Sequence, residues 1–208
     1  MTYTFLALGD SYTIGEGLPI YENFPYQTVQ ILRKAGISLM GPEIIARTGW
    51  TTDELRDSIA GTKLLPAYDF VSLLIGVNNE YRGRSPQEYT VQFGELLQQA
   101  IQLAGGQTAR VFVLSIPDWS ISPFAGSYLP DKAGRDRATV AGEIDVFNGI
   151  ARKIAGLCQV EFIDITPHSR SSSLFTSDGL HPSGQQYLYW AEQLAERIAE
   201  SIKARWTE

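Results

Sequence analysis

The chain has 208 residues, of which 44% are hydrophobic and 19% charged, a balance that is typical of a folded globular protein and excludes intrinsic disorder or a fibrous repeat. Seventeen lysines and arginines against 23 aspartates and glutamates give a formal net charge of −6. This acidic balance argues against nucleic acid as a partner, because phosphate backbones are also negative. The single cysteine, Cys158, cannot form an intrachain disulfide or a cysteine-based zinc site.

The length and the even composition predict one domain over residues 1–208, with no internal repeat and no linker. No apolar run reaches the roughly 18 residues of a membrane-spanning helix, so we expect no membrane insertion. The first residues lack the basic segment of a signal peptide. We therefore expect a cytoplasmic protein, or a secreted one if its amino terminus was processed or replaced.

Five short segments rich in apolar and β-branched residues predict strands. Three of them are apolar almost throughout, which is typical of strands buried on both faces of a parallel sheet. The five segments are residues 5–8, 43–46, 70–75, 110–114 and 160–164.

Amphipathic segments between the strands predict helices. Ser85 and Glu88 form a capping box with Pro86 at the first helical position, and apolar residues then recur at helical spacing from Tyr89 to Ala104. Alternating strands and helices predict an α/β fold with a parallel sheet of about five strands. The other expected helices lie over residues 140–154, 187–202 and 52–59 and around residues 29–32, and a long irregular loop is expected from residue 116 to about Lys132.

Polar and glycine-containing segments follow the predicted strands. Ligands collect at the carboxyl ends of the strands in open parallel sheets, so these segments are expected to meet at one edge. Together they supply a hydroxyl, an imidazole, a carboxylate and a side-chain amide, which is the set needed for acyl transfer through a serine nucleophile. The segments are residues 9–11 (GDS), 48–50 (TGW), 76–79 (GVNN), 117–119 (PDW) and, ahead of the last helix, 178–181 (DGLH).

Four of these segments resemble the sequence blocks of the SGNH, or GDSL, hydrolase family. Residues 9–15 (GDSYTIG) resemble the first block, Gly49 the second, residues 76–79 the third and residues 178–181 the last, in family order. The resemblance implies a flavodoxin-like, three-layer α/β/α sandwich that hydrolyses esters or thioesters without a metal or organic cofactor. Two positions depart from the family pattern: Tyr12 stands where leucine is usual, and Asn79 where aspartate is usual, which leaves the substrate open.

The roles of the candidate catalytic residues follow from their chemistry. Ser11 needs a base to take its proton, and His181 is the better of the two histidines, because Asp178 lies three residues before it and can orient its ring. The backbone N–H groups of Ser11 and Gly49 and the amide of Asn78 are expected to bind the oxyanion. His168 is expected to be an ordinary loop histidine and Asp10 an acceptor for backbone N–H groups.

Three classes of function remain to be weighed. An esterase is favoured over a catalytically inactive binding module of the same fold, because the whole set of candidate residues is present. A flavin or nucleotide binder is disfavoured, because no phosphate-binding glycine motif follows a strand. Aromatic residues after the strand ends favour a small-molecule ester that carries a short acyl group, such as acetyl, on a polar or carbohydrate alcohol. The alternative is a lysophospholipase or thioesterase substrate. The aromatic residues are Trp50, Tyr81, Trp119, Phe124 and Tyr128, interleaved with polar groups such as Asp118. The oligomeric state stays open.

Overall fold

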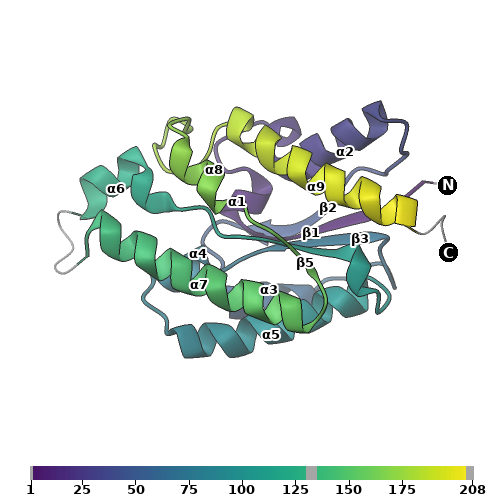
Figure 1. The fold of residues 1–208 in the computed structure, drawn as a ribbon, viewed down its shortest axis with the longest axis horizontal. Helices are drawn as coiled ribbons and strands as arrows, with labels where there is room; N and C mark the ends of the chain where they lie inside the picture. Colours follow the sequence, from purple (N-terminus) through teal and green to yellow (C-terminus); the bar gives the residue numbers. More distant parts are fainter. Residues whose placement is uncertain (1, 130–134, 205–208) are drawn as a thin grey trace.

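The computed structural model describes residues 2–129 and 135–204. Five parallel strands form one sheet with helices on both faces (Figure 1), so the predicted α/β/α sandwich is confirmed. The strands run in the order β2-β1-β3-β4-β5. Their bounds are Phe5–Asp10 for β1, Glu43–Arg47 for β2, Phe70–Leu74 for β3, Val111–Leu114 for β4 and Glu161–Ile163 for β5.

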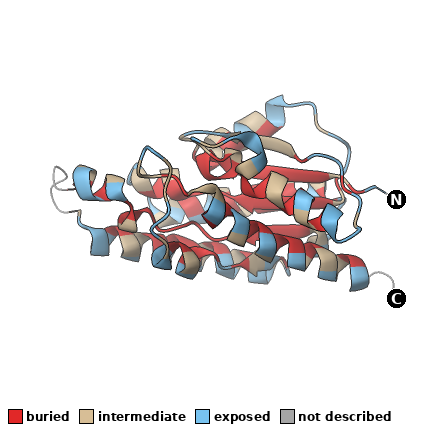
Figure 2. Ribbon diagram, turned by 90° about the horizontal axis from the view of Figure 1, so that it is seen from above, coloured by how far each residue is buried: buried red, intermediate tan, exposed pale blue. Residues whose placement is uncertain are grey.

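The three central strands, β1, β3 and β4, are buried at every residue, whereas the edge strands β2 and β5 are only partly buried. Their near-continuous apolar sequences reflect this position, because helices cover both faces of a central strand. The core follows the sheet and the inward sides of the helices, while the outward sides are exposed (Figure 2).

The five predicted helices are present with somewhat different ends. Helices α2 (Phe24–Lys34) and α9 (Gly184–Ala204) cover one face of the sheet, and α3 (Thr52–Gly61), α5 (Pro86–Leu103) and α7 (Arg137–Leu157) cover the other (Figure 1). The side chain of Ser85 accepts a hydrogen bond from the backbone N–H of Glu88, as its capping pattern predicts. Among the described helices, none is long and apolar enough to cross a membrane.

Four short helices were not predicted, because a segment of four to six residues is too short to show helical periodicity. They are α1 (Ser11–Ile14), α4 (Val77–Tyr81), α6 (Pro123–Tyr128) and α8 (Thr166–Ser171). The described part of the chain also has the 3-10 turns η1 (Ile20–Glu22), η2 (Thr108–Arg110) and η3 (Trp119–Ile121). The segment predicted as an irregular loop therefore contains η3 and α6, and its expected end near Lys132 lies outside the described residues.

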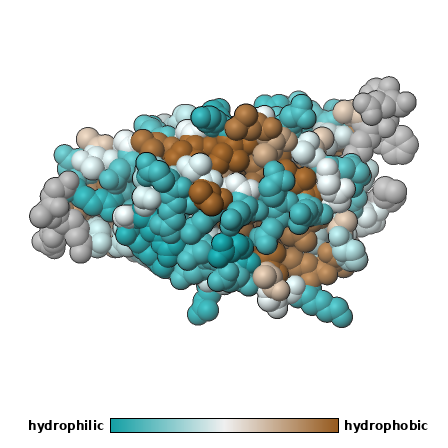
Figure 3. Space-filling model, turned by 90° about the horizontal axis from the view of Figure 1, so that it is seen from below, coloured by the Kyte–Doolittle hydropathy of each residue, from teal (hydrophilic) through white to brown (hydrophobic). Residues whose placement is uncertain are grey.

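The molecular surface is polar with scattered apolar side chains. On the face seen from below in Figure 3, hydrophilic side chains cover the centre and left, and apolar ones lie along the upper edge and to the right of the centre. Large apolar residues such as Val91 and Leu157 are exposed at separate places in the chain. Single exposed apolar residues of this kind are normal in globular proteins.

Candidate active site

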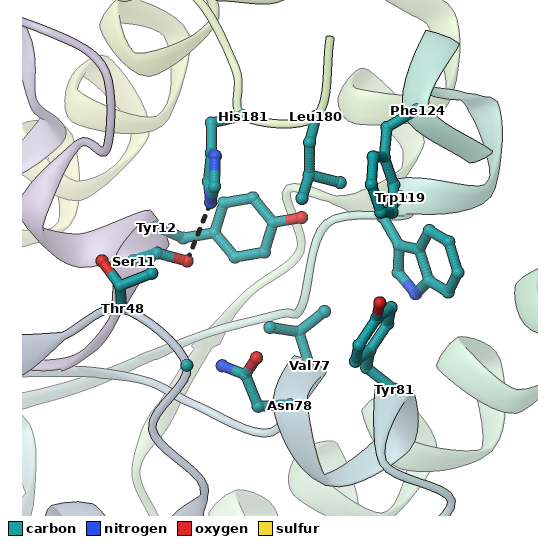
Figure 4. A pocket seen from close by; sticks show the side chains of 11 residues that line it. Ser11, Tyr12, Thr48, Val77, Asn78, Tyr81, Trp119, Phe124, Leu180 and His181 are labelled. Atoms are coloured by element: carbon teal, nitrogen blue, oxygen red, sulfur yellow. Dashed lines mark hydrogen bonds between the residues drawn. The ribbon is translucent and has the colours of Figure 1, made fainter. Parts of the chain in front are cut away.

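A continuous line of hydrogen-bonding groups joins Ser11, His181 and Asp178. The Oγ of Ser11 lies 3.0 Å from Nε2 of His181 (Figure 4), and Nδ1 of His181 lies 2.6 Å from Oδ2 of Asp178. Ser11 and His181 are only 5% and 7% exposed. The three side chains thus have the spacing at which a hydroxyl, an imidazole and a carboxylate can pass a proton and stabilise the resulting charge.

The strand β1 positions Ser11. Ser11 is the first residue of α1, directly after the strand, and Asp10 caps that helix by accepting a hydrogen bond from the backbone N–H of Tyr12 at 3.0 Å. Asp10 is therefore the backbone acceptor that was expected. Its side chain is fully buried, and burial raises the pKa of Asp10 to about 7, although the hydrogen bond from Tyr12 acts in the opposite direction.

The turn before α9 presents Asp178 to His181. Oδ1 of Asp178 accepts hydrogen bonds from the backbone N–H groups of Leu180 and His181, at 2.7 and 3.0 Å, and from the hydroxyl of Thr176 at 2.7 Å. Gly179 allows the fold-back by taking a φ of 69°. Burial alone would raise the pKa of Asp178, but the hydrogen bonds from the His181 ring and from these backbone groups hold it well below its usual range. The carboxylate is thus kept ionised beside the imidazole.

The loop after β2 and the helix α4 bring Gly49 and Asn78 to the same place. Gly49 has a φ of 84°, and its carbonyl accepts a hydrogen bond from Arg82 at 2.5 Å. Nδ2 of Asn78 donates to the carbonyl of Trp50 at 2.9 Å. An amide nitrogen carries two hydrogens, so this bond leaves a second one for a ligand.

These groups surround a pocket of about 190 Å³. Ser11 and His181 lie at one end of it, and an aromatic wall of Tyr81, Trp119 and Phe124 closes the other (Figure 4). We call this second end the aromatic end. The full lining is Ser11, Tyr12, Thr48, Gly49, Val77, Asn78, Tyr81, Trp119, Phe124, Leu180 and His181.

The aromatic end is a packed cluster of rings. The ring centroids of Tyr81 and Trp119 lie 5.4 Å apart, and Tyr128 stacks on both Tyr81 and Phe124. Nε1 of Trp119 donates a hydrogen bond of 2.8 Å to the buried carboxylate of Glu80. Because these contacts fix the rings against one another, the wall is a preformed surface.

The structure brings four of the five predicted site residues into the pocket wall: Ser11, Gly49, Asn78 and His181. The fifth, Asp178, reaches the pocket through His181. Sequence reasoning missed Tyr12, Thr48, Val77 and Leu180, although each is adjacent in sequence to a residue that it singled out.

Not every residue expected near the substrate lines the pocket. Trp50 and Tyr128 are outside its lining. The expected polar group Asp118 is also outside, because its buried carboxylate instead accepts hydrogen bonds from Arg170 and from the backbone of Ser120. The second histidine, His168, stacks on Tyr189 with ring centroids 3.7 Å apart, and it lies in α8 rather than in a loop. Within residues 2–129 and 135–204, no group of three or more His, Cys, Asp or Glu side chains could hold a metal ion.

Comparisons with solved structures show the same fold in several other proteins. A lipase/acylhydrolase from Enterococcus faecalis is 17% identical, with a TM-score of 0.70 over 94% of this chain and 95% of that one. Axe2, an acetylxylan esterase from Geobacillus stearothermophilus, is 16% identical, with a TM-score of 0.71 over 94% of each chain. TesA is 18% identical, with a TM-score of 0.65 over 98% of this chain and 99% of that one. At these identities the likeness shows the fold alone.

A comparison with curated proteins found no match to this chain. The model of the GDSL-like lipase/acylhydrolase family matches residues 7–188, which include Ser11, Gly49, Asn78, Asp178 and His181. The chain therefore belongs to the GDSL-like lipase/acylhydrolase family and is a carboxylic ester hydrolase.

Proposed function

We propose that the protein hydrolyses its ester through a covalent acyl-Ser11 intermediate. The observation that carries this proposal is the hydrogen-bonded line from Ser11 through His181 to Asp178, at 3.0 and 2.6 Å, at the end of a pocket. An inactive binding module would have no need to keep the hydroxyl, the imidazole and an ionised carboxylate in this alignment.

The reaction would proceed in two displacements. Ser11 Oγ bonds to the ester carbonyl carbon while its proton passes to Nε2 of His181, and the ionised Asp178 stabilises the imidazolium. The oxyanion receives hydrogen bonds from the N–H groups of Ser11 and Gly49 and from the Asn78 amide. As the carbon–oxygen bond to the alcohol breaks, His181 returns its proton to the leaving alkoxide. Water, deprotonated by the same imidazole, then releases the acid and regenerates Ser11.

The substrate we propose is a short acyl group, such as acetyl, on a polar or carbohydrate alcohol. The small volume of the pocket favours a small acyl group. The flat rings of Tyr81, Trp119 and Phe124 suit the C–H faces of a sugar ring. A lysophospholipase or thioesterase activity would instead require an aliphatic channel for a long chain.

Ser11→Ala and His181→Ala should each lower kcat by at least about 10³-fold, and the double variant should lose little more, because the two groups act as a unit. The measurements are p-nitrophenyl acetate hydrolysis and labelling by a fluorophosphonate probe. His168→Ala is the matched control, since this histidine lies outside the pocket lining and should leave both readouts unchanged. Activity or labelling near the wild-type level in Ser11→Ala would contradict the acyl-Ser11 mechanism, and a wild-type protein without turnover or labelling would point to a binding module.

The acyl part of the proposal is tested by kcat/KM across p-nitrophenyl esters of increasing chain length. We expect acetyl to be preferred over chains of about eight carbons, since a long chain needs more apolar channel than the pocket offers. A preference for the long chains would instead identify a lipid or thioester hydrolase.

A further inference from the structure

The polar groups on the aromatic end of the pocket already have protein partners, with one exception. Nε1 of Trp119 donates to Glu80 at 2.8 Å. The hydroxyl of Tyr81 is hydrogen-bonded to Tyr128. Neither group is therefore available to a substrate without breaking an existing bond.

The exception is Tyr12, which stands where the family usually has leucine. Tyr12 is only 3% exposed. Its ring lies edge-on to the ring of His181, with centroids 5.6 Å apart, and also packs against Trp190. Its hydroxyl points along the pocket toward the aromatic end (Figure 4). Among residues 2–129 and 135–204, this hydroxyl has no hydrogen-bond partner.

An unpaired hydroxyl on the wall of a pocket is open to a ligand. A ligand group that covers this hydroxyl without forming a hydrogen bond to it removes its hydration without compensation. Burial and the nearby carboxylates of Asp10 and Asp118 raise the pKa of Tyr12, so the group stays a neutral phenol that can both donate and accept a hydrogen bond. A leucine or phenylalanine at this position could pack in the same place but would offer no hydrogen-bonding group to a ligand.

The position of the ring indicates which part of the substrate meets the hydroxyl. Tyr12 packs against His181, the group that protonates the leaving alcohol in the proposed reaction, whereas Gly49 and Asn78 face the oxyanion. In the proposed reaction the alcohol part of the ester takes its proton from His181 and therefore leaves on the His181 side. The Tyr12 hydroxyl extends from that side toward the aromatic end.

We propose that Tyr12 is a specificity-determining residue whose hydroxyl forms a hydrogen bond with a free hydroxyl of the substrate's alcohol moiety. The inference rests on the proposed ester hydrolysis and narrows its substrate to polyol esters, such as acetylated sugars. A hydrocarbon in the same place would leave the phenol without a hydrogen-bond partner. Tyr12 therefore also lowers the preference of the enzyme for esters of lipid alcohols.

The test compares Tyr12→Phe with the wild type on two acetyl esters that differ in their hydroxyls: an acetylated methyl xyloside and cyclohexyl acetate. We expect kcat/KM for the sugar ester to fall about 5- to 30-fold, the usual effect of one hydrogen bond to a buried group. For cyclohexyl acetate it should stay within about twofold or rise. Tyr81→Phe is the matched control, because its hydroxyl is already held by Tyr128, and it should change the two substrates equally.

A second measurement does not depend on turnover. Unacetylated methyl xyloside is titrated into Ser11→Ala and into Ser11→Ala/Tyr12→Phe, and binding is followed by NMR. We expect the second protein to bind about 5- to 30-fold more weakly. A wild-type enzyme that hydrolyses neither ester would contradict the proposed function, and this titration would still decide the role of Tyr12.

Three outcomes would overturn the inference. An equal loss on both esters would mean that Tyr12 acts only by packing against His181. No loss on either ester, or xyloside binding that is absent or insensitive to Tyr12→Phe, would mean that the hydroxyl does not contact the alcohol moiety.

Discussion

Asn78 links the loop after β2 to the proposed reaction centre. One hydrogen of its amide is engaged by the carbonyl of Trp50, so the side chain is held in place before a substrate arrives. A donor that is already oriented can stabilise the developing oxyanion without reorganisation in the transition state. The same bond fixes the loop that carries the Gly49 N–H group.

Asn78→Ala should therefore lower kcat by about 10²–10³-fold with little change in KM, because the lost hydrogen bond forms chiefly in the transition state. Steady-state kinetics on p-nitrophenyl acetate measure this split. Arg82→Ala is the control, since it releases the carbonyl of Gly49 without removing an oxyanion donor. Because the Arg82 side chain is exposed, we expect this variant to lower kcat by tenfold or less. A rise in KM with kcat intact would show that Asn78 binds the ground state.

The sequence predicted those site residues whose chemistry is tied to a short local pattern. Asp178 and His181 are three residues apart, and the turn between them dictates their contact. The surroundings of Asp118 were wrongly predicted, because its ion pair with Arg170 joins segments 52 residues apart. The direction of the Tyr12 hydroxyl likewise depends on packing against α9, far along the chain.

At the scale of elements, α4 connects the pocket to the rest of the fold. Val77, Asn78 and Tyr81 face the pocket from this five-residue helix. Asn79 bonds to the backbone N–H and the hydroxyl of Thr52 at the start of α3. The side chain of Glu80, the next residue, instead accepts a hydrogen bond from Trp119 in η3. The helix was not predicted because it is short, yet its consecutive residues hold three parts of the site together.

Glu80 is the residue whose loss should disturb this arrangement most. Its side chain is 1% exposed and accepts hydrogen bonds from Trp119 Nε1 and from Arg135, which also pairs with Glu143. Glu80→Ala would leave the Nε1 group of Trp119 without its acceptor, while Arg135 would keep its pair with Glu143, so we expect a loss of about 1–3 kcal/mol in the free energy of unfolding. Urea denaturation measures this loss, and Glu80→Gln should recover most of it because an amide oxygen can still accept from Trp119.

The matched control for this prediction is Glu143→Gln. Glu143 also pairs with Arg135, but its side chain is 45% exposed, so an exposed pair of this kind should contribute about 1 kcal/mol or less. Equal effects of Glu80→Ala and Glu143→Gln would contradict the assignment of Glu80 as the buried link between α4 and η3.

At the scale of the whole molecule, the sheet explains why so much of the fold was predictable. The central strands β1, β3 and β4 are buried on both faces, so their sequences are apolar throughout and easy to recognise. The short helices at the carboxyl edge show no such pattern. Each has only four to six residues, too few for apolar side chains to recur at helical spacing. The sequence therefore predicts the elements in which hydrophobic burial acts on many residues in a row. It does not predict side-chain positions that depend on a single contact between distant segments.

The stability of the whole molecule should depend on pH through Asp10, which is fully buried at the end of the central strand β1. Its pKa in the folded protein, raised by burial from 3.8 to about 7, exceeds its value in the unfolded chain. The folded state therefore holds this proton more tightly, and the contribution of Asp10 to stability is present below about pH 4 and lost as the pH rises toward 7. Asp178 acts in the opposite direction, since its lowered pKa makes its contribution disappear only as the pH falls below about 4.

Asp10→Asn isolates the first effect, because asparagine keeps an acceptor for the Tyr12 N–H group but cannot ionise. We expect the free energy of unfolding of the wild type, measured by urea denaturation, to fall by up to about 4 kcal/mol relative to this variant between pH 4 and pH 8. The free energy of unfolding of the variant should therefore increase relative to that of the wild type as the pH rises. Parallel curves for the two proteins over this range would mean that the carboxyl of Asp10 ionises as easily in the folded protein as in the unfolded chain, and that the buried end of β1 carries its charge without cost.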